Sequence, residues 1–330
     1  PGAYTPGTAS SADLQSLRDQ AMSLLHNGLA KSTRRTYSAA QRRFLEFCYW
    51  SGYFHESGSP LPTSEWTLIL FVTELSRSLK ASTIKVYLSG VRSLHIENGF
   101  KNPLIDCPRL EQVLRGIKRV QGVAIRPRLP ITASILRRVE PLLVLHTYRD
   151  SMFWAACCTG FFGFLRAAEF TTNGTYDPTI HLSLSDVSVD RRSNPTVVCL
   201  RIKASKTDQF RKGHVLRIGS TNTSLCAVQA LMRYLHLRGR KPGPLFVHEN
   251  GSYLTRDHLV SWMRDAMSRL GLNGNFSGHS FRIGAATTAA SVGIPDHLIK
   301  TMGRWLSDAY QMYIRTPSSV IDSVAGRLVS

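Results

Sequence analysis

Residues 196–218 read T-V-V-C-L-R-I-K, then A-S-K-T-D-Q-F-R-K-G, then H-V-L-R-I, and they interrupt an otherwise helical pattern. The two outer segments are rich in branched apolar residues that alternate with polar ones, which is typical of strands. The polar segment between them has the composition of a turn and carries Lys206. The stretch therefore predicts a β-hairpin with Lys206 on or near its tip.

The sequence on both sides of this hairpin predicts a mixed second half. Residues 181–189, H-L-S-L-S-D-V-S-V, also alternate, so we expect a third strand and a small antiparallel sheet. Apolar residues elsewhere in this half recur at helical spacing. The predicted helices cover residues 133–146, 150–170, 224–238, 255–270, 279–292 and 295–302, with a last helical stretch from about residue 307 to the end.

The first half is predicted to be helical. Apolar stripes within residues 13–119 indicate five helices, and the small polar residues 1–12 indicate a flexible N-terminus. Residues 120–132 hold two prolines among basic residues and predict an extended linker. The expected fold is mainly α with a small antiparallel β-sheet, in a helical domain over residues 13–119 and an α+β domain over residues 133–330.

The composition favours a polyanionic partner. The 330 residues include 41 Lys and Arg against 22 Asp and Glu, a formal net charge of +19, and both halves share the excess. A charge of this size points to nucleic acid. The longest apolar run, residues 152–165, is too short to span a bilayer, so no membrane association is expected.

Metal and nucleotide chemistry lack their usual sequence signals. The chain has no phosphate-binding glycine loop, no H-E-x-x-H and no C-x-x-C, so neither a metal nor another cofactor is expected. Scattered cysteines without a disulfide framework fit a reducing compartment, the cytosol or the nucleus. The six are Cys48, Cys107, Cys157, Cys158, Cys199 and Cys226.

Two groups of basic residues are candidates for contact with a phosphate backbone. Ser32-Thr33-Arg34-Arg35 opens the second predicted helix, where hydroxyls can cap and a helix N-terminus can meet a phosphate. The second group follows the last helix of the first half into the linker, where a merely solvated basic segment is the alternative. The candidates are Arg34, Arg35, Arg42, Arg43, Lys118, Arg119, Arg126 and Arg128.

Three fragments of the second half contain residues that could bind a phosphate or take part in catalysis. Arg166 follows a very apolar run and needs a partner, which Glu169 on the same helical face can supply. In G-H-S-F-R, residues 278–282, His279 and Arg282 project from one face of a first helical turn. The third fragment, residues 302–315, ends in two tyrosines three apart. Each fragment alone also fits a structural role, as an ion pair, a satisfied histidine or packed aromatics.

Their combination resembles one family. Arg166, then S-K-T-D-Q-F-R-K-G (205–213), H-S-F-R-I-G-A (279–285) and G-R-W-L-S-D-A-Y (303–310), in this order, resemble the tyrosine recombinase (phage integrase) family over nearly the whole chain. The residues in these motifs are most similar to those of the eukaryotic mobile-element branch of the family, which includes the DIRS, Ngaro and Crypton elements. The resemblance implies a helical core-binding (SAM-like) domain, a basic linker and a catalytic domain with a three-stranded sheet.

The resemblance also implies the chemistry, a metal- and ATP-independent DNA strand transfer. Arg166 and Arg282 would clamp the scissile phosphate, and Tyr313 would attack it to give a 3′-phosphotyrosyl intermediate. Lys206 would protonate the 5′-oxygen leaving group. His279 would bind the phosphate or transfer a proton, and Glu169 would orient Arg166 or His279.

Two assignments keep an alternative. Lys203 also precedes the turn, although the S-K-T context favours Lys206. Tyr310 competes with Tyr313, and the family's usual spacing of ten residues from the motif glycine favours Tyr313.

The same spacing places Arg304 where the family usually has His or Trp, with Trp305 one residue later. Residue type favours Trp305 as the side chain that packs on the phosphate, whereas spacing favours Arg304. Arg304 is therefore also a candidate DNA contact.

The expected function is that of a site-specific recombinase or integrase that mobilises a eukaryotic transposable element in the nucleus. The expected partners are double-stranded DNA and further copies of the chain, as a dimer on one site and a tetramer in synapsis. Two alternatives are a domesticated, non-catalytic DNA-binding protein and a type IB topoisomerase-like relaxase.

Overall fold

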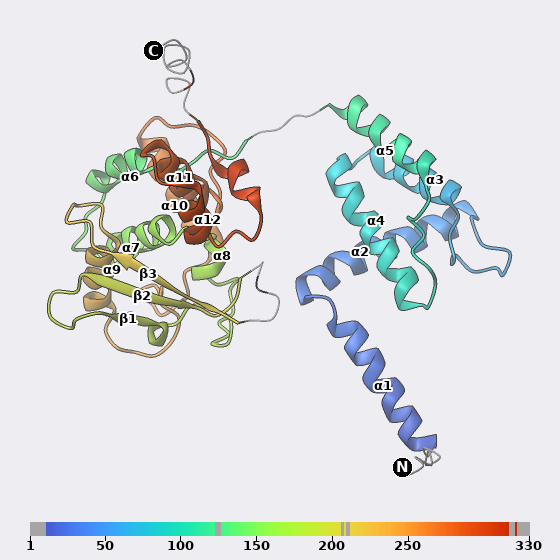
Figure 1. Cartoon of the computed structure of the whole chain (residues 1–330), viewed down its shortest axis with the longest axis horizontal. Helices are drawn as coiled ribbons and strands as arrows, with labels where there is room; N and C mark the ends of the chain where they lie inside the picture. The colour runs from blue at the N-terminus through green and yellow to red at the C-terminus, as the bar shows by residue number, and fades with distance from the viewer. Residues whose placement is uncertain (1–10, 123–126, 206–207, 209–211, 317–320, 322–330) are drawn as a thin grey trace, which may run out of the picture. The chain divides into compact units, whose positions relative to one another are not determined.

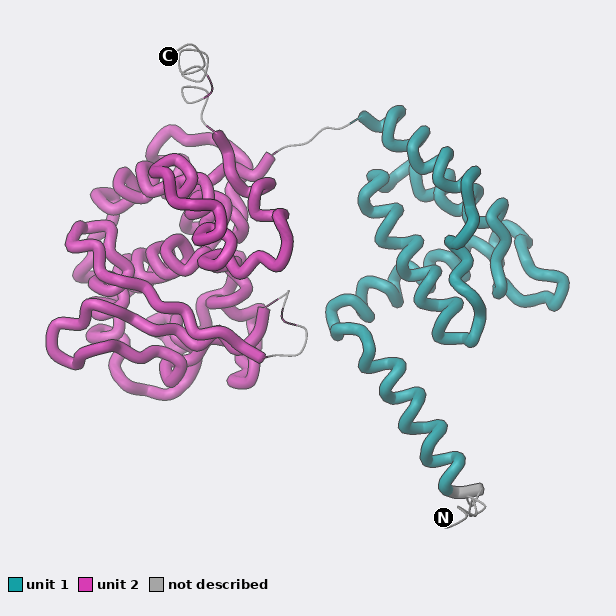
Figure 2. Tube along the Cα trace, viewed as in Figure 1, with its two compact units in different colours: residues 1–125 teal, residues 126–330 magenta. Residues whose placement is uncertain are grey.

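The computed structural model describes residues 11–122, 127–205, 208, 212–316 and 321. The chain divides into two compact units, residues 1–125 and 126–330 (Figure 2). The division falls inside the segment predicted as a linker. Residues 1–10, most of the segment predicted to be flexible, lie outside the described residues.

The described part of the N-terminal unit consists of the five predicted helices and their connections (Figure 1). These are α1 (Ser11–Asn27), α2 (Lys31–Ser51), α3 (Glu65–Ser76), α4 (Ala81–Glu97) and α5 (Pro108–Gln121). Aromatic and aliphatic side chains from α2, α3 and α4, including Phe44, Phe71 and Ile84, form its core. Burial of these side chains explains the apolar stripes of α2, α3 and α4, whereas the large apolar side chains of α1, among them Leu17 and Leu24, are exposed.

The C-terminal unit combines helices with one three-stranded sheet (Figure 1). Its helical elements, in chain order, are α6 (Ala133–Val139), η1 (Glu140–Leu142), α7 (Tyr148–Phe162), α8 (Ala167–Phe170), η2 (Leu184–Asp186), α9 (Ala227–Arg238), α10 (Arg256–Arg269), α11 (Ser280–Ser291), α12 (Asp296–Gly303) and η3 (Asp308–Tyr313). The strands are β1 (Val187–Val189), β2 (Val197–Ile202) and β3 (His214–Gly219). The predicted fold class is confirmed.

The sheet is antiparallel in the order β1-β2-β3, with Leu200 opposite Leu216. The predicted strand over residues 181–189 is wrong in its first half. The backbone N–H of Ser183 donates to the Asp186 carboxylate at 2.8 Å, which closes a short 3-10 turn over residues 184–186. An alternating pattern does not distinguish such a turn from a strand. Of residues 181–189, the strand β1 covers Val187–Val189.

The predicted helix over residues 150–170 is also wrong, because the helix breaks between α7 and α8. Gly163 ends α7, and Phe164 takes a left-handed conformation with φ 49°. Arg166 then caps α8 in extended conformation. Because of this break, Arg166 is the N-cap of α8 and not a residue near the end of one long helix.

Two smaller differences follow from local chemistry. The predicted helix over residues 133–146 ends early, because Pro141 cannot continue it and a 3-10 turn takes its place. The described part of the last predicted helical stretch is the 3-10 element η3, followed by extended backbone at Ile314.

Gly284 of α11 lies against the backbone that precedes α6. The Ile131 N–H donates to the Ser280 carbonyl at 2.9 Å, so this segment runs along the start of α11. A Cβ on Gly284 would lie 1.8 Å from the Ile131 carbonyl oxygen. The absence of a side chain at Gly284 therefore permits this close packing.

We expect Gly284→Ala to lower the free energy of unfolding of the C-terminal unit by about 3 kcal/mol, since a backbone carbonyl must shift to admit the methyl group. Denaturant unfolding followed by tryptophan fluorescence measures this change. Gly219→Ala in the same unit is the control, because nothing lies within 4 Å of its added Cβ. Equal stability losses in the two variants would contradict the packing argument.

Candidate functional site

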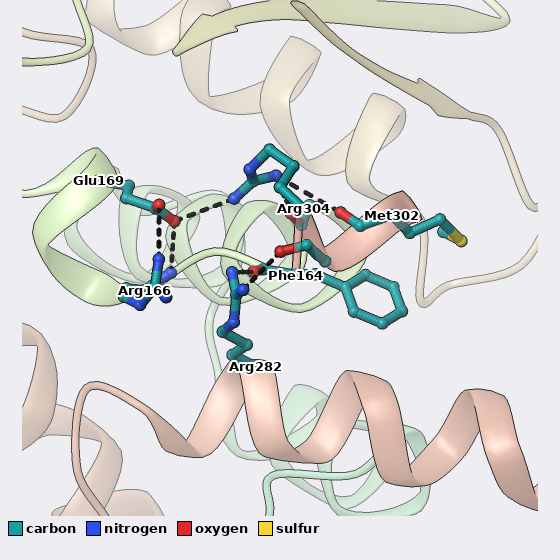
Figure 3. A network of polar contacts seen from close by, with 8 residues as sticks. Phe164, Arg166, Glu169, Arg282, Met302 and Arg304 are labelled. Carbon is teal, nitrogen blue, oxygen red and sulfur yellow. Dashed lines mark hydrogen bonds and ion pairs between the residues drawn. The ribbon is translucent and has the colours of Figure 1, made fainter. Parts of the chain in front are cut away.

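Glu169 joins two arginines in a buried polar cluster of the C-terminal unit (Figure 3). Its side chain is 3% exposed and pairs with two guanidinium groups. One carboxylate oxygen lies 3.3 Å from Arg166 Nη1, and the other lies 3.1 Å from Arg304 Nη2. The Arg166 backbone N–H also donates to the carboxylate at 2.8 Å. Glu169 therefore holds Arg166, as predicted, and Arg304 in addition.

Arg304 reaches this cluster because α12 ends there. The residue takes a left-handed conformation with φ 56° directly after Gly303. Its Nη1 donates to the Gly163 carbonyl at 3.2 Å, at the end of α7. Burial lowers the pKa of Arg304, and Glu169 partly offsets this change. Arg304, with its side chain 12% exposed, thus belongs to the buried cluster rather than to an open DNA-binding surface.

Arg282 of α11 is fully buried beside this pair. Its two terminal nitrogens donate to the carbonyls of Phe164 and Gly303 (Figure 3). Its Nε has no hydrogen-bond partner within the described part of the chain. Burial, and then the charge of Arg166, lower the pKa of Arg282 to about 9, so the group still carries its charge at neutral pH.

Aromatic side chains cover the Arg282 guanidinium. The Trp305 ring centre lies 4.1 Å from Arg282 Cζ, and the Tyr313 ring centre lies 5.8 Å from the same atom. The Trp305 and Tyr313 rings are 5.2 Å apart. A guanidinium over aromatic faces is a stabilising cation–π arrangement. The structure therefore brings Tyr313 to the arginines of its own chain.

The other candidate nucleophile is engaged elsewhere. The Tyr310 hydroxyl donates to Asp296 at 2.9 Å, and this hydrogen bond raises the pKa of Tyr310. Tyr310 is 5% exposed and packs on Trp305 from another side. Its geometry is that of a structural residue, which favours Tyr313 as the nucleophile.

His279 caps the N-terminal end of α11 and is half-buried among cationic groups. Burial, followed by the charges of Arg128 and Arg166, lowers the pKa of His279 to about 4. The imidazole is therefore neutral at pH 7 and keeps one donor and one acceptor nitrogen. A neutral imidazole beside guanidinium groups can pass a proton or donate to an anion.

The two candidate lysines differ in what the structure shows of them. Lys203 is held by Asp186 at 2.6 Å and by the Ser183 hydroxyl at 2.8 Å, so its amino group stabilises the start of β1. Lys206 lies outside the described residues. His214, which begins β3, has a pKa lowered by burial and then by the charge of Arg304. The strand that follows Lys206 thus starts close to the cluster.

The candidate DNA contacts outside this cluster are distributed over both units. Exposed residues among them are Arg35, Arg42, Arg43, Lys118, Arg119 and Arg128. Arg34 instead donates to the His26 carbonyl at 2.8 Å and so caps α1. The predicted hydroxyl cap on α2 is wrong, because Ala30 is the N-cap. Arg126 lies outside the described residues.

Sequence reasoning missed three residues of the site. Arg256, in the first turn of α10, contributes to the low pKa of His279. Asp296 holds Tyr310, and Thr287 bonds to the backbone around Tyr313. The partners of Asp296 and Thr287 lie 14 and more residues away in the sequence, so no short motif marks them.

The cluster can bind and polarise a tetrahedral anion. It combines three guanidinium groups and one carboxylate, so its net charge is positive, and planar guanidinium groups match phosphate oxygens. Among the described residues no group of three or more His, Cys, Asp or Glu side chains is arranged to hold a metal ion. None of the described helices has the length and apolarity needed to cross a membrane.

Comparisons with known proteins agree on one class. No protein-family model matches the chain. An integrase/recombinase XerD homolog from Selenomonas ruminantium is 25% identical over 280 residues, which cover 81% of this chain and 76% of that protein.

Several similar solved structures are DNA complexes of a recombinase or an integrase. XerH bound to palindromic difH matches with a TM-score of 0.64 at 15% identity, over 97% of this chain and 85% of XerH. The Tn1549 transposon integrase with transposon right end DNA gives 0.59 at 15% identity, over 94% and 98%. A lambda integrase dimer on a COC′ core site gives 0.55 at 15% identity, over 92% and 77%.

The fold is thus that of the tyrosine recombinases, with a helical unit followed by a helical unit that carries a three-stranded sheet. The sequence match to the XerD homolog is consistent with this fold.

We expect His279 to titrate near pH 4 in histidine NMR spectra of the DNA-free protein. Because its folded-state pKa lies below the ordinary value of about 6.5, its protonation opposes folding, and stability falls as the pH drops from about 6.5 towards 4. Arg128→Ala is expected to raise this pKa, since one nearby charge is removed.

Arg43→Ala is the control for this titration, because Arg43 is exposed in the other unit and is not among the causes of the shift. A His279 pKa near 6.5 in the intact protein would contradict the cationic environment described above.

Proposed function

We propose that the protein is a site-specific DNA recombinase or integrase that cuts and rejoins double-stranded DNA through a 3′-phosphotyrosine intermediate. The observation that carries this proposal is the convergence of Arg166, Arg282 and Arg304 with the Tyr313 ring in one cluster. These residues come from segments up to about 150 positions apart, and a shared phosphate is a chemical reason for gathering them.

In the proposed reaction the Tyr313 phenol oxygen attacks the scissile phosphorus, its proton passes to the neutral His279, and the bond to the 5′-oxygen breaks. Arg166 and Arg282 bind the non-bridging oxygens, where negative charge develops in the transition state. Lys206 protonates the departing 5′-oxygen. The phosphotyrosyl bond keeps the energy of the phosphodiester, so a 5′-hydroxyl from another strand can reverse the step without ATP.

Glu169 and Arg304 complete the site. Glu169 fixes Arg166 and Arg304 before DNA arrives, which lowers the reorganisation needed during the reaction. Arg304 occupies the family's His or Trp position by spacing, and its guanidinium can donate to the phosphate. His279 starts neutral, and an incoming phosphate anion raises its pKa by offsetting the surrounding positive charge.

Arg282 needs a local rearrangement before it can act. In the structure its terminal nitrogens are bound to carbonyls, and Trp305 and Tyr313 cover its face. Because Arg282 is fully buried, a phosphate reaches it only when neighbouring groups shift, and Trp305 and Tyr313 are among these neighbours.

A more specific function is inferred from the amino-acid sequences of the three motifs. We propose that the chain mobilises a eukaryotic transposable element, because its three quoted fragments are most similar to that branch of the family. Because the DNA of a eukaryotic element lies in the nucleus, we also propose that the protein acts there. Strand exchange between two sites needs one active copy for each of four cleavages, so we propose a dimer on each site and a tetramer in synapsis.

The strongest basic surfaces support a DNA partner. Exposed arginines of α2 and basic residues of α5 lie in the N-terminal unit, and the cluster lies in the C-terminal unit. Contacts from both units would account for a charge excess that both halves share. The binding of such a surface to DNA weakens as salt rises.

We expect the wild-type protein to form a covalent adduct with a suicide substrate, a duplex of its native target sequence nicked beside the scissile phosphate. Tyr313→Phe is expected to abolish the adduct, because it lacks the attacking oxygen. Denaturing gel electrophoresis measures the adduct, and mass spectrometry locates the modified tyrosine.

Tyr310→Phe is the matched control, since it removes the same atom from a tyrosine three residues away whose hydroxyl is bound to Asp296. It is expected to retain adduct formation. An adduct that survives in Tyr313→Phe and disappears in Tyr310→Phe would reverse the assignment, and no wild-type adduct would reject a strand transferase.

A further inference from the structure

Lys203 is held at the end of β2 by two side chains. Its Nζ lies 2.6 Å from an Asp186 carboxylate oxygen and donates to the Ser183 hydroxyl at 2.8 Å. The side chains of Lys203 and Asp186 are only 17% and 8% exposed. A charged group at such burial is costly without partners, so the ion pair and the hydrogen bond together fix the amino group in one position.

The same contacts join two segments of the sheet. Ser183 caps η2 and Asp186 is its last residue, directly before β1, whereas Lys203 directly follows β2. The Ser183 hydroxyl is also hydrogen-bonded to the Tyr176 hydroxyl at 2.6 Å. We call these four side chains, Tyr176, Ser183, Asp186 and Lys203, the hairpin anchor. The hairpin anchor fixes the point at which the chain leaves the sheet after β2.

Asp208 fixes the other side of the turn. Its two carboxylate oxygens accept from the backbone N–H groups of Lys212 and Gly213 at 3.0 and 2.7 Å, directly before β3. Its own N–H donates to the Ser205 carbonyl at 3.1 Å. Lys206 lies outside the described residues, and in the sequence it comes between Ser205 and Asp208. The described backbone on both sides of Lys206 is therefore held by hydrogen bonds.

The surroundings of Lys203 do not suit a proton donor to DNA. Transfer of its proton to a DNA oxygen would leave the Asp186 carboxylate buried without its counter-charge, which is costly. A permanent ion pair at the base of the hairpin is instead suited to holding the hairpin in place.

We propose that Lys203 is a positioning residue that acts through Asp186 and Ser183 to place the hairpin, so that Lys206 can protonate the 5′-oxygen leaving group. This inference rests on the function proposed above. It separates the roles of the two lysines: Lys206 acts on the DNA, and Lys203 acts on the hairpin that carries Lys206.

The test compares adduct formation on two suicide substrates, one with the ordinary bridging 5′-oxygen and one in which sulfur replaces that oxygen. Attack by Tyr313 on the second substrate breaks the P–S bond and releases a thiolate, which needs no proton because a thiol is far more acidic than an alcohol. A defect confined to protonation of the leaving group therefore disappears on the sulfur substrate. A loss of folding or of DNA binding slows the reaction on both substrates.

Lys203→Met removes the charge and keeps a side chain of similar length. On the ordinary substrate the rate is expected to fall roughly 10- to 100-fold, because a general acid contributes about 10²–10⁴-fold and a misplaced acid loses part of this. On the sulfur substrate the same variant is expected to react at a rate close to that of the wild type. Lys203→Arg keeps a charge that can pair with Asp186, so it is expected to recover most of the lost rate on the ordinary substrate.

Two further variants calibrate the comparison. Lys206→Ala lacks the proposed acid itself and is expected to be slow on the ordinary substrate and to recover on the sulfur substrate. Lys241→Met is the matched control for the loss of a lysine, since Lys241 is exposed in the loop after α9 of the same unit. It is expected to match the wild type on both substrates.

Two results would overturn the positioning role while leaving the strand transferase intact. The first is a Lys203→Met variant that loses the same rate on both substrates or on neither. The second is a normal rate for Lys206→Ala on the ordinary substrate together with a Lys203→Arg variant as slow as Lys203→Met, which would make Lys203 itself the acid. No adduct with the wild-type protein on either substrate would instead reject the function on which the proposal rests.

Discussion

Three arginine side chains buried around a single carboxylate form the constraint on which the C-terminal unit depends. A buried charge without partners is costly, and Glu169 alone cannot balance Arg166, Arg282 and Arg304. The missing partners are main-chain carbonyls of Gly163, Phe164 and Gly303. All three belong to helix C-terminal ends, where carbonyls lack a partner in their own helix and the negative end of the helix dipole lies. The fold therefore ends α7 and α12 at the same place.

The same constraint explains two strained residues. Phe164 and Arg304 both have left-handed backbones, with φ 49° and 56°, although neither is glycine. Such a conformation costs about 1–2 kcal/mol per residue. A hydrogen bond to a charged group contributes about 1.5–3 kcal/mol, so the carbonyl contacts that these turns create can offset the strain. The turns thus fix the positions of the guanidinium groups in the DNA-free protein.

Local patterns predicted what depends on local chemistry. Alternation over residues 196–218 indicated β2 and β3. The set Arg166, His279, Arg282 and Tyr313 was instead implied by the resemblance of the motif order to the tyrosine recombinase family, and the structure places the Tyr313 ring near Arg282. The break after α7 could not be predicted, because the apolar run from residue 152 to 165 continues through it. The role of Arg304 towards Glu169 and the contacts of Thr287 join segments far apart in sequence, so only the folded chain shows them.

The free energy of the contact between Trp305 and Arg282 is similar in size to that of the hydrogen bonds that a bound phosphate supplies. DNA binding can therefore decide whether Arg282 is available for the reaction. A desolvated cation–π contact is worth about 2 kcal/mol, and Trp305 supplies one at 4.1 Å from the guanidinium carbon. A phosphate that replaces this contact supplies charge-assisted hydrogen bonds of about 1.5–3 kcal/mol each. One such bond roughly matches the loss, and two exceed it. A phosphate that is already bound by Arg166 or Arg304 can therefore displace the contact with Trp305. A phosphate that these arginines do not hold leaves Arg282 in contact with Trp305. Because the Trp305 ring also packs on the Tyr313 ring, a shift of the indole changes the surroundings of both the arginine and the tyrosine.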